Sequence, residues 1–138
     1  MNKKVWILGF IVLILGIFLF YFFNQDKNMY WMYGRIIEIK ENSIVVSGMA
    51  RSLKSGDEYR QERTVEFRIT PETVFKKSIT VISLANKITP PEMADGSLSD
   101  LMNNTNVRIL RVESNEDLFT VNEATALYIN YESIILKD

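Results

Sequence analysis

The sequence contains neither cysteine nor histidine among its 138 residues. Without cysteine the chain can form no disulfide, no thiolate metal site and no cysteine nucleophile. Without histidine it lacks the commonest general base, the Ser-His-Asp arrangement and the usual zinc ligands. These two absences exclude more enzyme classes than any other compositional feature. We therefore predict a non-enzymatic protein with no catalytic residues, no cofactor and no metal ligands.

An excess of charge of either sign is also missing. The chain has 16 basic and 17 acidic residues, a net charge of −1. Two of the basic residues, Lys3 and Lys4, stand at the N-terminus, so 14 basic and 17 acidic residues remain beyond them, a net charge of −3. Nucleic acids and anionic lipid surfaces attract strongly basic proteins. We therefore expect no nucleic-acid partner.

One long apolar run occupies residues 5–23, VWILGFIVLILGIFLFYFF. Only the phenol of Tyr21 interrupts its apolar character. As a helix this run spans roughly 28 Å, close to the ~30 Å hydrocarbon core of a bilayer. A single span must satisfy its backbone hydrogen bonds internally, as a helix does. The sequence therefore predicts one transmembrane helix that contacts the lipid bilayer through residues 5–23.

The flanking charges predict the orientation of this helix. Lys3 and Lys4 precede the run, whereas Asp26 and Lys27 follow it and cancel. The positive-inside rule then places the N-terminus in the cytoplasm and the C-terminal domain outside the cell membrane. A cleaved signal peptide is the main alternative, with a shorter apolar region followed by small residues. Because the run instead ends in aromatic residues, we expect an uncleaved, single-pass signal-anchor.

This anchor divides the chain into three parts. We expect a cytoplasmic tip and transmembrane helix in residues 1–24, a juxtamembrane linker in residues 25–33 and a β domain in residues 34–138. About 115 residues beyond the anchor suffice for one domain with a real core and are too few for two. The sequence leaves two readings of residues 30–33, YWMY, open. They form either a belt of rings at the membrane interface or the first packed residues of the domain.

Alternation of apolar and polar residues predicts the first strands. Residues 34–40 and 43–48 are predicted to form a β-hairpin, with Ile37 and Ile39 on one face of its first strand. Residues 64–70, TVEFRIT, give the cleanest alternation. Pro71 cannot donate to a strand ladder, so it should end this strand.

Shorter elements are predicted beyond Pro71. Val74 and Phe75 are expected in a short strand or corner, residues 80–84 in another short strand, and residues 88–97 in a loop. Ser97 is predicted to cap one helical turn, which residues 103–106 end. The closing strands are predicted at 107–113, 118–121 and 124–131, with residues 133–138 as a tail.

Five short patterns carry a resemblance to a known family. The residues that carry it are Gly34, Ile36 or Ile37, Ile39, Ile44 and Val46; Val65, Phe67, Ile69, Thr70, Thr73 and Phe75; Ser97, Asp100 and Leu101; Val107 and Ile109; and Ala126 and Ile129. This order resembles the small exported bacterial domains of unknown function that adopt an OB-like β-barrel. The resemblance implies a mostly β fold, a small OB-like β-barrel with one short helix between its third and fourth main strands. It implies no functional residues.

Candidate chemistry is sparse. Three acidic groups, Asp57 with Glu58, Asp95 with Asp100, and Glu116 with Asp117, lack the loop spacing of a calcium site. OB-like barrels often bind ligands on one face through aromatic and basic side chains. The candidates for such a face are Arg35, Arg51, Arg60, Arg63, Arg68, Arg108 and Arg111, with Tyr59, Tyr128 and Tyr131. The alternative is that Arg68 and Arg108, which stand beside Glu66 and Glu113 on outward faces of their strands, form ordinary solvated cross-strand pairs.

Two functions follow from these observations. The first is a structural or interaction module of the cell envelope, whose extracytoplasmic domain contacts an envelope protein partner. The second is a module that binds glycans or another extracellular oligomer on the barrel face. Residues 76–96 form a long segment, in which Val81, Ile82 and Leu84 are too apolar for disorder. We expect these three residues to fold back as an extra strand or lid, or to meet a partner.

Overall fold

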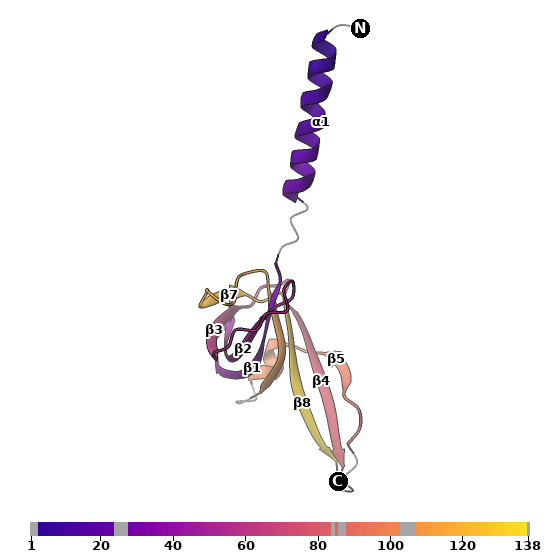
Figure 1. The fold of residues 1–138 in the computed structure, drawn as a ribbon. Helices are drawn as coiled ribbons and strands as arrows, with labels where there is room; N and C mark the ends of the chain where they lie inside the picture. The colour runs from indigo at the N-terminus through magenta and orange to yellow at the C-terminus, as the bar shows by residue number, and fades with distance from the viewer. Residues whose placement is uncertain (1–2, 24–27, 84, 86–87, 103–106, 138) are drawn as a thin grey trace.

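The computed structural model of the chain describes residues 3–23, 28–83, 85, 88–102 and 107–137. These residues form a mostly β protein with an N-terminal helix, one eight-stranded sheet and a second, short helix (Figure 1). In chain order the elements are α1 (Lys3–Phe23), β1 (Tyr30–Ile39), β2 (Ser43–Ser52), β3 (Arg63–Arg68), β4 (Val74–Ser83), β5 (Glu92–Asp95), α2 (Leu98–Met102), β6 (Arg108–Ser114), β7 (Glu123–Thr125) and β8 (Tyr128–Lys137).

Helix α1 stands apart from the sheet (Figure 1). Its described side chains are exposed, and most of them are apolar, from Ile7 to Phe22. No helix long and apolar enough to cross a membrane was identified within the described residues. The transmembrane anchor therefore stays a prediction.

The sheet has the strand order β5-β4-β8-β6-β1-β2-β3-β7. Five of its neighbouring pairs are antiparallel, and two, β3 with β7 and β4 with β8, are parallel. Only Ala126 and Leu127 separate β7 from β8. The Ala126 N–H donates to the Arg68 carbonyl of β3 at 2.9 Å, and the Leu127 N–H donates to the Glu113 carbonyl of β6 at 2.8 Å. One segment therefore connects β3 to β6, which are separated by β1 and β2 in the strand order.

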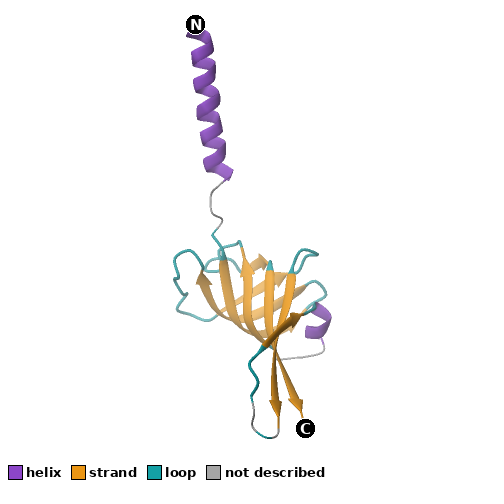
Figure 2. Ribbon diagram, turned by 90° about the vertical axis from the view of Figure 1, so that its right-hand side faces the viewer, coloured by secondary structure: helices purple, strands orange, loops and turns teal. Residues whose placement is uncertain are grey.

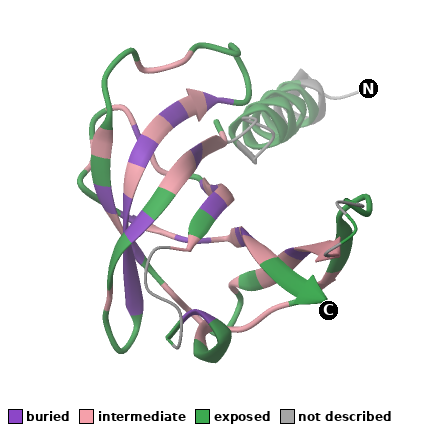
Figure 3. Cartoon of the chain, turned by 90° about the horizontal axis from the view of Figure 1, so that it is seen from below, coloured by how far each residue is buried: buried purple, intermediate pink, exposed green. Residues whose placement is uncertain are grey.

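The core lies inside this curved sheet, and alternate residues of the strands fill it. Burial is complete or nearly so for Met32, Ile36, Ile44, Val46, Ala50, Val65, Phe67, Leu101, Ile109, Val112, Leu118, Ala124, Ala126, Ile129 and Tyr131. The short helix α2 contributes Leu101. Figure 3 shows buried positions interspersed with intermediate and exposed ones along the strands.

The first strand begins earlier than predicted, at Tyr30 instead of Gly34. Met32 is fully buried, so these residues are the first packed part of the sheet. The prediction that Ile37 and Ile39 share one face of this strand is wrong, because Ile37 is 59% exposed whereas Ile39 packs against the core. A β-bulge between Ile36 and Glu38 shifts the register and gives the core position to Ile36.

Glycine fills two facing positions where β1 and β2 approach closely. Gly34 pairs with Gly48. A Cβ atom on Gly34 would lie 2.0 Å from the Ser47 carbonyl oxygen, and one on Gly48 would lie 1.9 Å from that of Tyr33. Only glycine permits this approach, because in both cases the obstructing atoms belong to backbone.

The segment after Pro71 differs most from the prediction. Two separate short strands were expected, at Val74 and Phe75 and at residues 80–84, but residues 74–83 form one ten-residue strand, β4. The loop expected at residues 88–97 contains strand β5. Of the alternatives left open for this segment, the structure shows an added strand: Val81 and Ile82 lie in β4, which pairs with β5, and Leu84 lies outside the described residues. The tail also continues β8 to Lys137, in parallel register with β4.

The strand predicted at residues 118–121 is wrong. These residues form a turn, because the Asp117 carbonyl accepts the N–H groups of Thr120 and Val121, and Asp117 Oδ1 accepts that of Phe119 at 2.9 Å. The predicted helix start is confirmed: Ser97 Oγ accepts the Asp100 N–H at 3.2 Å. Residues 103–106, expected to end this helix, lie outside the described residues.

Candidate functional site

The acidic groups have separate structural roles. Asp95 forms an ion pair with Lys76, and Glu116 Oε2 accepts the Thr125 N–H. Asp100 accepts the Tyr131 hydroxyl at 2.9 Å and lies 3.5 Å from Lys77 Nζ. Within the described residues, no three such side chains come together in a way that could hold a metal ion.

Two of the predicted ion pairs have other partners. Glu66 accepts hydrogen bonds from Lys40 at 2.9 Å and from Ser43 at 2.6 Å, and Glu113 pairs with Arg111. Donation by Ser43, followed by that of Lys40, holds the pKa of Glu66 below its ordinary value. Arg68 and Arg108 are both exposed.

Two of the three tyrosines proposed for a binding face, Tyr131 and Tyr59, pack inside the domain. Tyr131 is only 3% exposed and belongs to the core. Burial and the hydrogen bond to Asp100 raise its pKa to about 12. Tyr59 packs against Phe119 with ring centroids 5.6 Å apart, and the guanidinium of Arg63 lies 5.2 Å from the Tyr59 ring centre. These rings therefore stabilise the domain.

A different pair of aromatic residues lies on the outer face of the sheet. Trp31 and Tyr33 alternate along β1 with buried Met32, and their ring centroids are 5.6 Å apart. The guanidinium carbons of Arg51 and Arg111 lie 5.6 Å and 5.2 Å from the Trp31 ring centre. Cation–π attraction of this kind favours a fixed position for both guanidinium groups.

The carboxylates of Glu58 and Glu113 lie beside these rings and arginines. Glu58 accepts the Tyr33 hydroxyl at 2.7 Å and an Arg51 N–H at 2.8 Å. Donation by Arg51, followed by that of Tyr33, lowers the pKa of Glu58, and the bond to Glu58 raises the pKa of Tyr33. Glu113 lies beside Arg111. Side chains from β1, β2 and β6 thus hold one another in place.

Two hollows meet at Tyr33 on this face. One of about 240 Å³ is lined by Trp31, Tyr33, Arg51, Arg108, Ile109 and Leu110. The other, of about 390 Å³, is lined by Tyr33, Gly34, Arg35, Ile37, Ser47, Gly48, Met49 and Glu62. We call the two together the outer groove. It combines aromatic rings with arginines, the composition expected of a ligand-binding face.

The second unusual surface is the projecting end of β4 and β8 (Figure 2). We call residues 78–83 of β4 and 132–137 of β8 the C-terminal ribbon. Three consecutive residues there, Ile134, Ile135 and Leu136, are 55%, 41% and 78% exposed. Because neighbouring residues of a strand point to opposite faces, both faces of the ribbon carry apolar side chains.

The backbone of β8 in this ribbon is paired on one side only. Strand β4 pairs with β8 as far as Lys137, whereas β6 pairs with it only between Tyr128 and Tyr131. Among the described strands, none covers the other edge of β8 beyond Tyr131. Such an edge presents backbone donors and acceptors to an incoming strand.

Sequence reasoning identified the arginines of the outer groove and missed its rings. Trp31 and Tyr33 were assigned to a membrane belt or to the core, so their shared face was not considered. The signal was present: Trp31, Tyr33 and Arg35 occupy alternate positions, which places them on one face of a strand. The pairing of Trp31 with Arg51 depends on the register of β1 and β2, which the sequence does not specify.

Comparison with known proteins adds no relative: no family model, curated protein or solved structure matches the chain.

Proposed function

We propose that this chain is a single-pass membrane protein whose extracytoplasmic domain docks another protein of the cell envelope through its C-terminal ribbon. The proposal has three parts, the anchor, the domain and the docking surface. The observation on which the proposal rests is the exposed apolar surface of the ribbon.

The anchor rests on the sequence. Residues 5–23 carry no charge, and the two lysines that precede them favour a cytoplasmic N-terminus. The domain would then lie outside the membrane, joined to it by a short linker. A chain held in this way is suited to positioning another protein at the membrane surface.

The pairing order supports an OB-like barrel. Strands β1, β2, β3 and β6, together with the two-part strand β7–β8, give the pairs expected of five barrel strands, including the parallel pair of β3 with β7. Helix α2 lies between β3 and β6, where that fold has its short helix. The hairpin-like insertion of β4 and β5 would then be the part added to the barrel.

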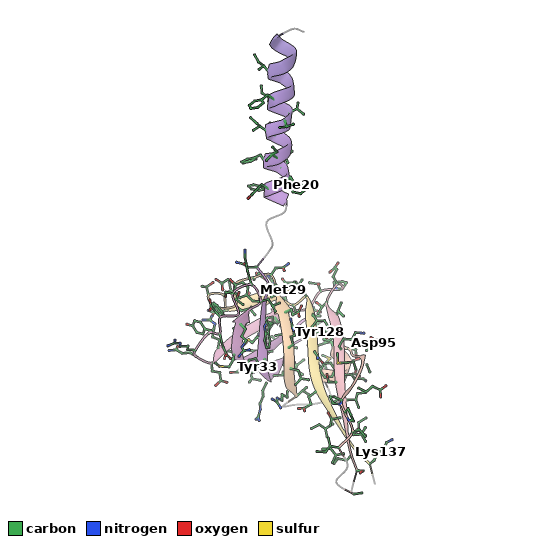
Figure 4. All side chains as sticks on the ribbon, turned by 45° about the vertical axis from the view of Figure 1, so that its right-hand side comes forward. Phe20, Met29, Tyr33, Asp95, Tyr128 and Lys137 are labelled. Carbon is green, nitrogen blue, oxygen red and sulfur yellow. The ribbon has the colours of Figure 1, made fainter. Side chains whose placement is uncertain are left out.

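The ribbon supports protein docking for two physical reasons. Exposed neighbouring apolar side chains are costly in water, and a covering protein would remove this cost. The unpaired edge of β8 can form backbone hydrogen bonds with a partner segment in extended conformation, which would add a strand to the sheet. Lys137 also lies at the opposite end of the domain from Met29, where the chain enters from α1, so the ribbon projects away from the entry point (Figure 4).

Site-specific photo-crosslinking in intact cells tests this function. A photoreactive amino acid at Leu136 should give a discrete adduct with one other protein. The same photoreactive amino acid in place of Val74 should give no adduct. Val74 is 48% exposed but lies at the other end of β4. Changing Ile134→Ser should abolish the adduct from position 136.

Two outcomes would refute the docking proposal. Equal adducts from positions 136 and 74 would mean that the ribbon has no special affinity. An adduct of twice the chain's own mass would show that a second copy, and not another envelope protein, occupies the ribbon.

A further inference from the structure

The outer groove is separate from the ribbon, and its chemistry points to a different kind of ligand. We propose that the outer groove binds an acidic saccharide, a sugar chain that carries carboxylate groups. This binding site goes beyond the protein docking proposed above and does not depend on it.

The aromatic part of the groove suits sugar rings. The C–H groups on one face of a sugar carry partial positive charge and pack against the negative face of an aromatic ring. Tyr33 lines both hollows, and Trp31 lines one of them. The Tyr33 ring is held by its hydroxyl, which donates to Glu58, so its orientation is fixed before a ligand arrives.

The arginines supply the recognition of a carboxylate. A guanidinium group has five N–H donors and can bind both oxygens of a carboxylate. Arg51 donates to Glu58 through one terminal nitrogen, and its Nε is buried without a hydrogen-bond partner among the described residues. Arg108 lines the same hollow, is exposed, and has no side-chain hydrogen bond or ion pair with any described residue. Arg35, which lines the second hollow, is likewise exposed and has no side-chain hydrogen bond or ion pair with any described residue, so these two arginines are the ones most available to a ligand.

The charge balance argues against a dense polyanion. Four arginines (Arg35, Arg51, Arg108 and Arg111) face three glutamates (Glu58, Glu62 and Glu113) in and beside the groove. Nucleic acid binding depends on many phosphate contacts to basic residues, which this nearly neutral surface does not provide. A sugar chain with spaced carboxylates needs few cationic contacts and more apolar ones, which matches the groove.

Trp31 offers a direct way to observe binding. The sequence has two tryptophans, Trp6 and Trp31, so the full-length Trp6→Phe protein in detergent micelles reports on the groove alone. Titration with tetragalacturonate should change the fluorescence of Trp31 in a saturable way. Fully methyl-esterified tetragalacturonate has the same rings without the charges, and it should bind at least about tenfold more weakly.

Two arginine variants locate the site. Arg108→Gln should weaken tetragalacturonate binding by about tenfold or more, because it removes a charge-assisted contact. Arg68→Gln is the matched control, since Arg68 is an exposed arginine of β3 that lines neither hollow. It should leave binding unchanged. Thermal unfolding of both variants verifies that each is folded, and isothermal titration calorimetry detects binding that leaves fluorescence unaltered.

Several results would overturn the proposal. They are no saturable binding by either method up to about 1 mM ligand, equal binding of the acid and its methyl ester, and equal effects of the two arginine variants. Competition by inorganic tripolyphosphate as strong as that by tetragalacturonate would show an unselective anion site and would likewise refute a saccharide site.

Discussion

At the scale of single residues, Tyr131 joins the core to helix α2. Its hydroxyl donates to Asp100 and accepts the Ser97 N–H at 3.3 Å. Tyr131→Phe should lower the free energy of unfolding by about 1–2 kcal/mol, because a hydrogen bond to a charged group is lost and a backbone donor loses its acceptor. Urea denaturation measures this change. Tyr128→Phe, on the same strand with no hydroxyl bond to a described residue, is the control, and an equal loss there would contradict the prediction.

Asp100 should make stability depend on pH. The Tyr131 hydrogen bond, together with the nearby charge of Lys77, lowers the pKa of Asp100 from its ordinary value of 3.8. The stabilisation is therefore present above pH 3.8 and is lost as pH falls through the lower pKa of the folded state. Asp100→Asn should destabilise the protein at neutral pH, and its difference from wild type should shrink as the pH falls to about 3.

Denaturation curves across this pH range provide the measurement. A difference between Asp100→Asn and wild type that stays constant with pH would contradict the prediction. The effect of Asp100→Asn should also be smaller in a Tyr131→Phe background, because the two groups share one hydrogen bond.

At the scale of elements, the close approach of the paired strands β1 and β2 depends on Gly34 and Gly48. Gly34→Ala would place a Cβ atom 2.0 Å from a backbone oxygen, so the two strands would have to separate. We expect a loss of about 3 kcal/mol or more in the free energy of unfolding, at the upper end of overpacking effects. Gly16→Ala makes the same chemical change where nothing lies within 4 Å, and it should leave the unfolding of the domain unchanged. Near-equal stability of the two variants would count against the close approach.

The elements also show which parts of the fold are predictable from sequence. Residues 64–70 were predicted well because one side of β3 is buried, so apolar residues recur at every second position. Residues 43–48 were predicted from a short apolar run, and residues 43–46 are all buried in β2. Strand β4 was not predicted as one strand, because its residues are half-buried on both faces and apolar and polar residues alternate only weakly along it. The turn at residues 118–121 misled the prediction because buried Leu118 lies in it, held there by Asp117.

The two candidate surfaces were less predictable than the fold. The apolar residues of the C-terminal ribbon lie in a segment that was predicted as a tail with a little more strand, and their exposure follows from tertiary pairing with β4. The outer groove adjoins a β-bulge in β6, where the register shifts between Ile109 and Arg111. A bulge of this kind re-aims side chains, and the local sequence gives no clear signal for it.

At the scale of the whole molecule, the orientation of the chain in a membrane is the prediction on which its cellular role depends. The absence of cysteine makes it testable without background, because any labelled thiol must be an introduced one. Asn2→Cys and Lys54→Cys place single thiols at the N-terminus and in an exposed turn of the domain. Both changes preserve Lys3 and Lys4, whose charges are expected to hold the N-terminus in the cytoplasm.

A membrane-impermeant maleimide applied to intact cells should label the Lys54→Cys protein and should leave the Asn2→Cys protein unlabelled until the membrane is permeabilised. The reverse pattern would place the domain in the cytoplasm. The ribbon would then face cytoplasmic proteins, and the outer groove would have no access to extracellular saccharides. Labelling of both proteins in intact cells would mean that residues 5–23 do not span the bilayer. A spanning helix would place the two thiols on opposite sides of the hydrocarbon core of the bilayer.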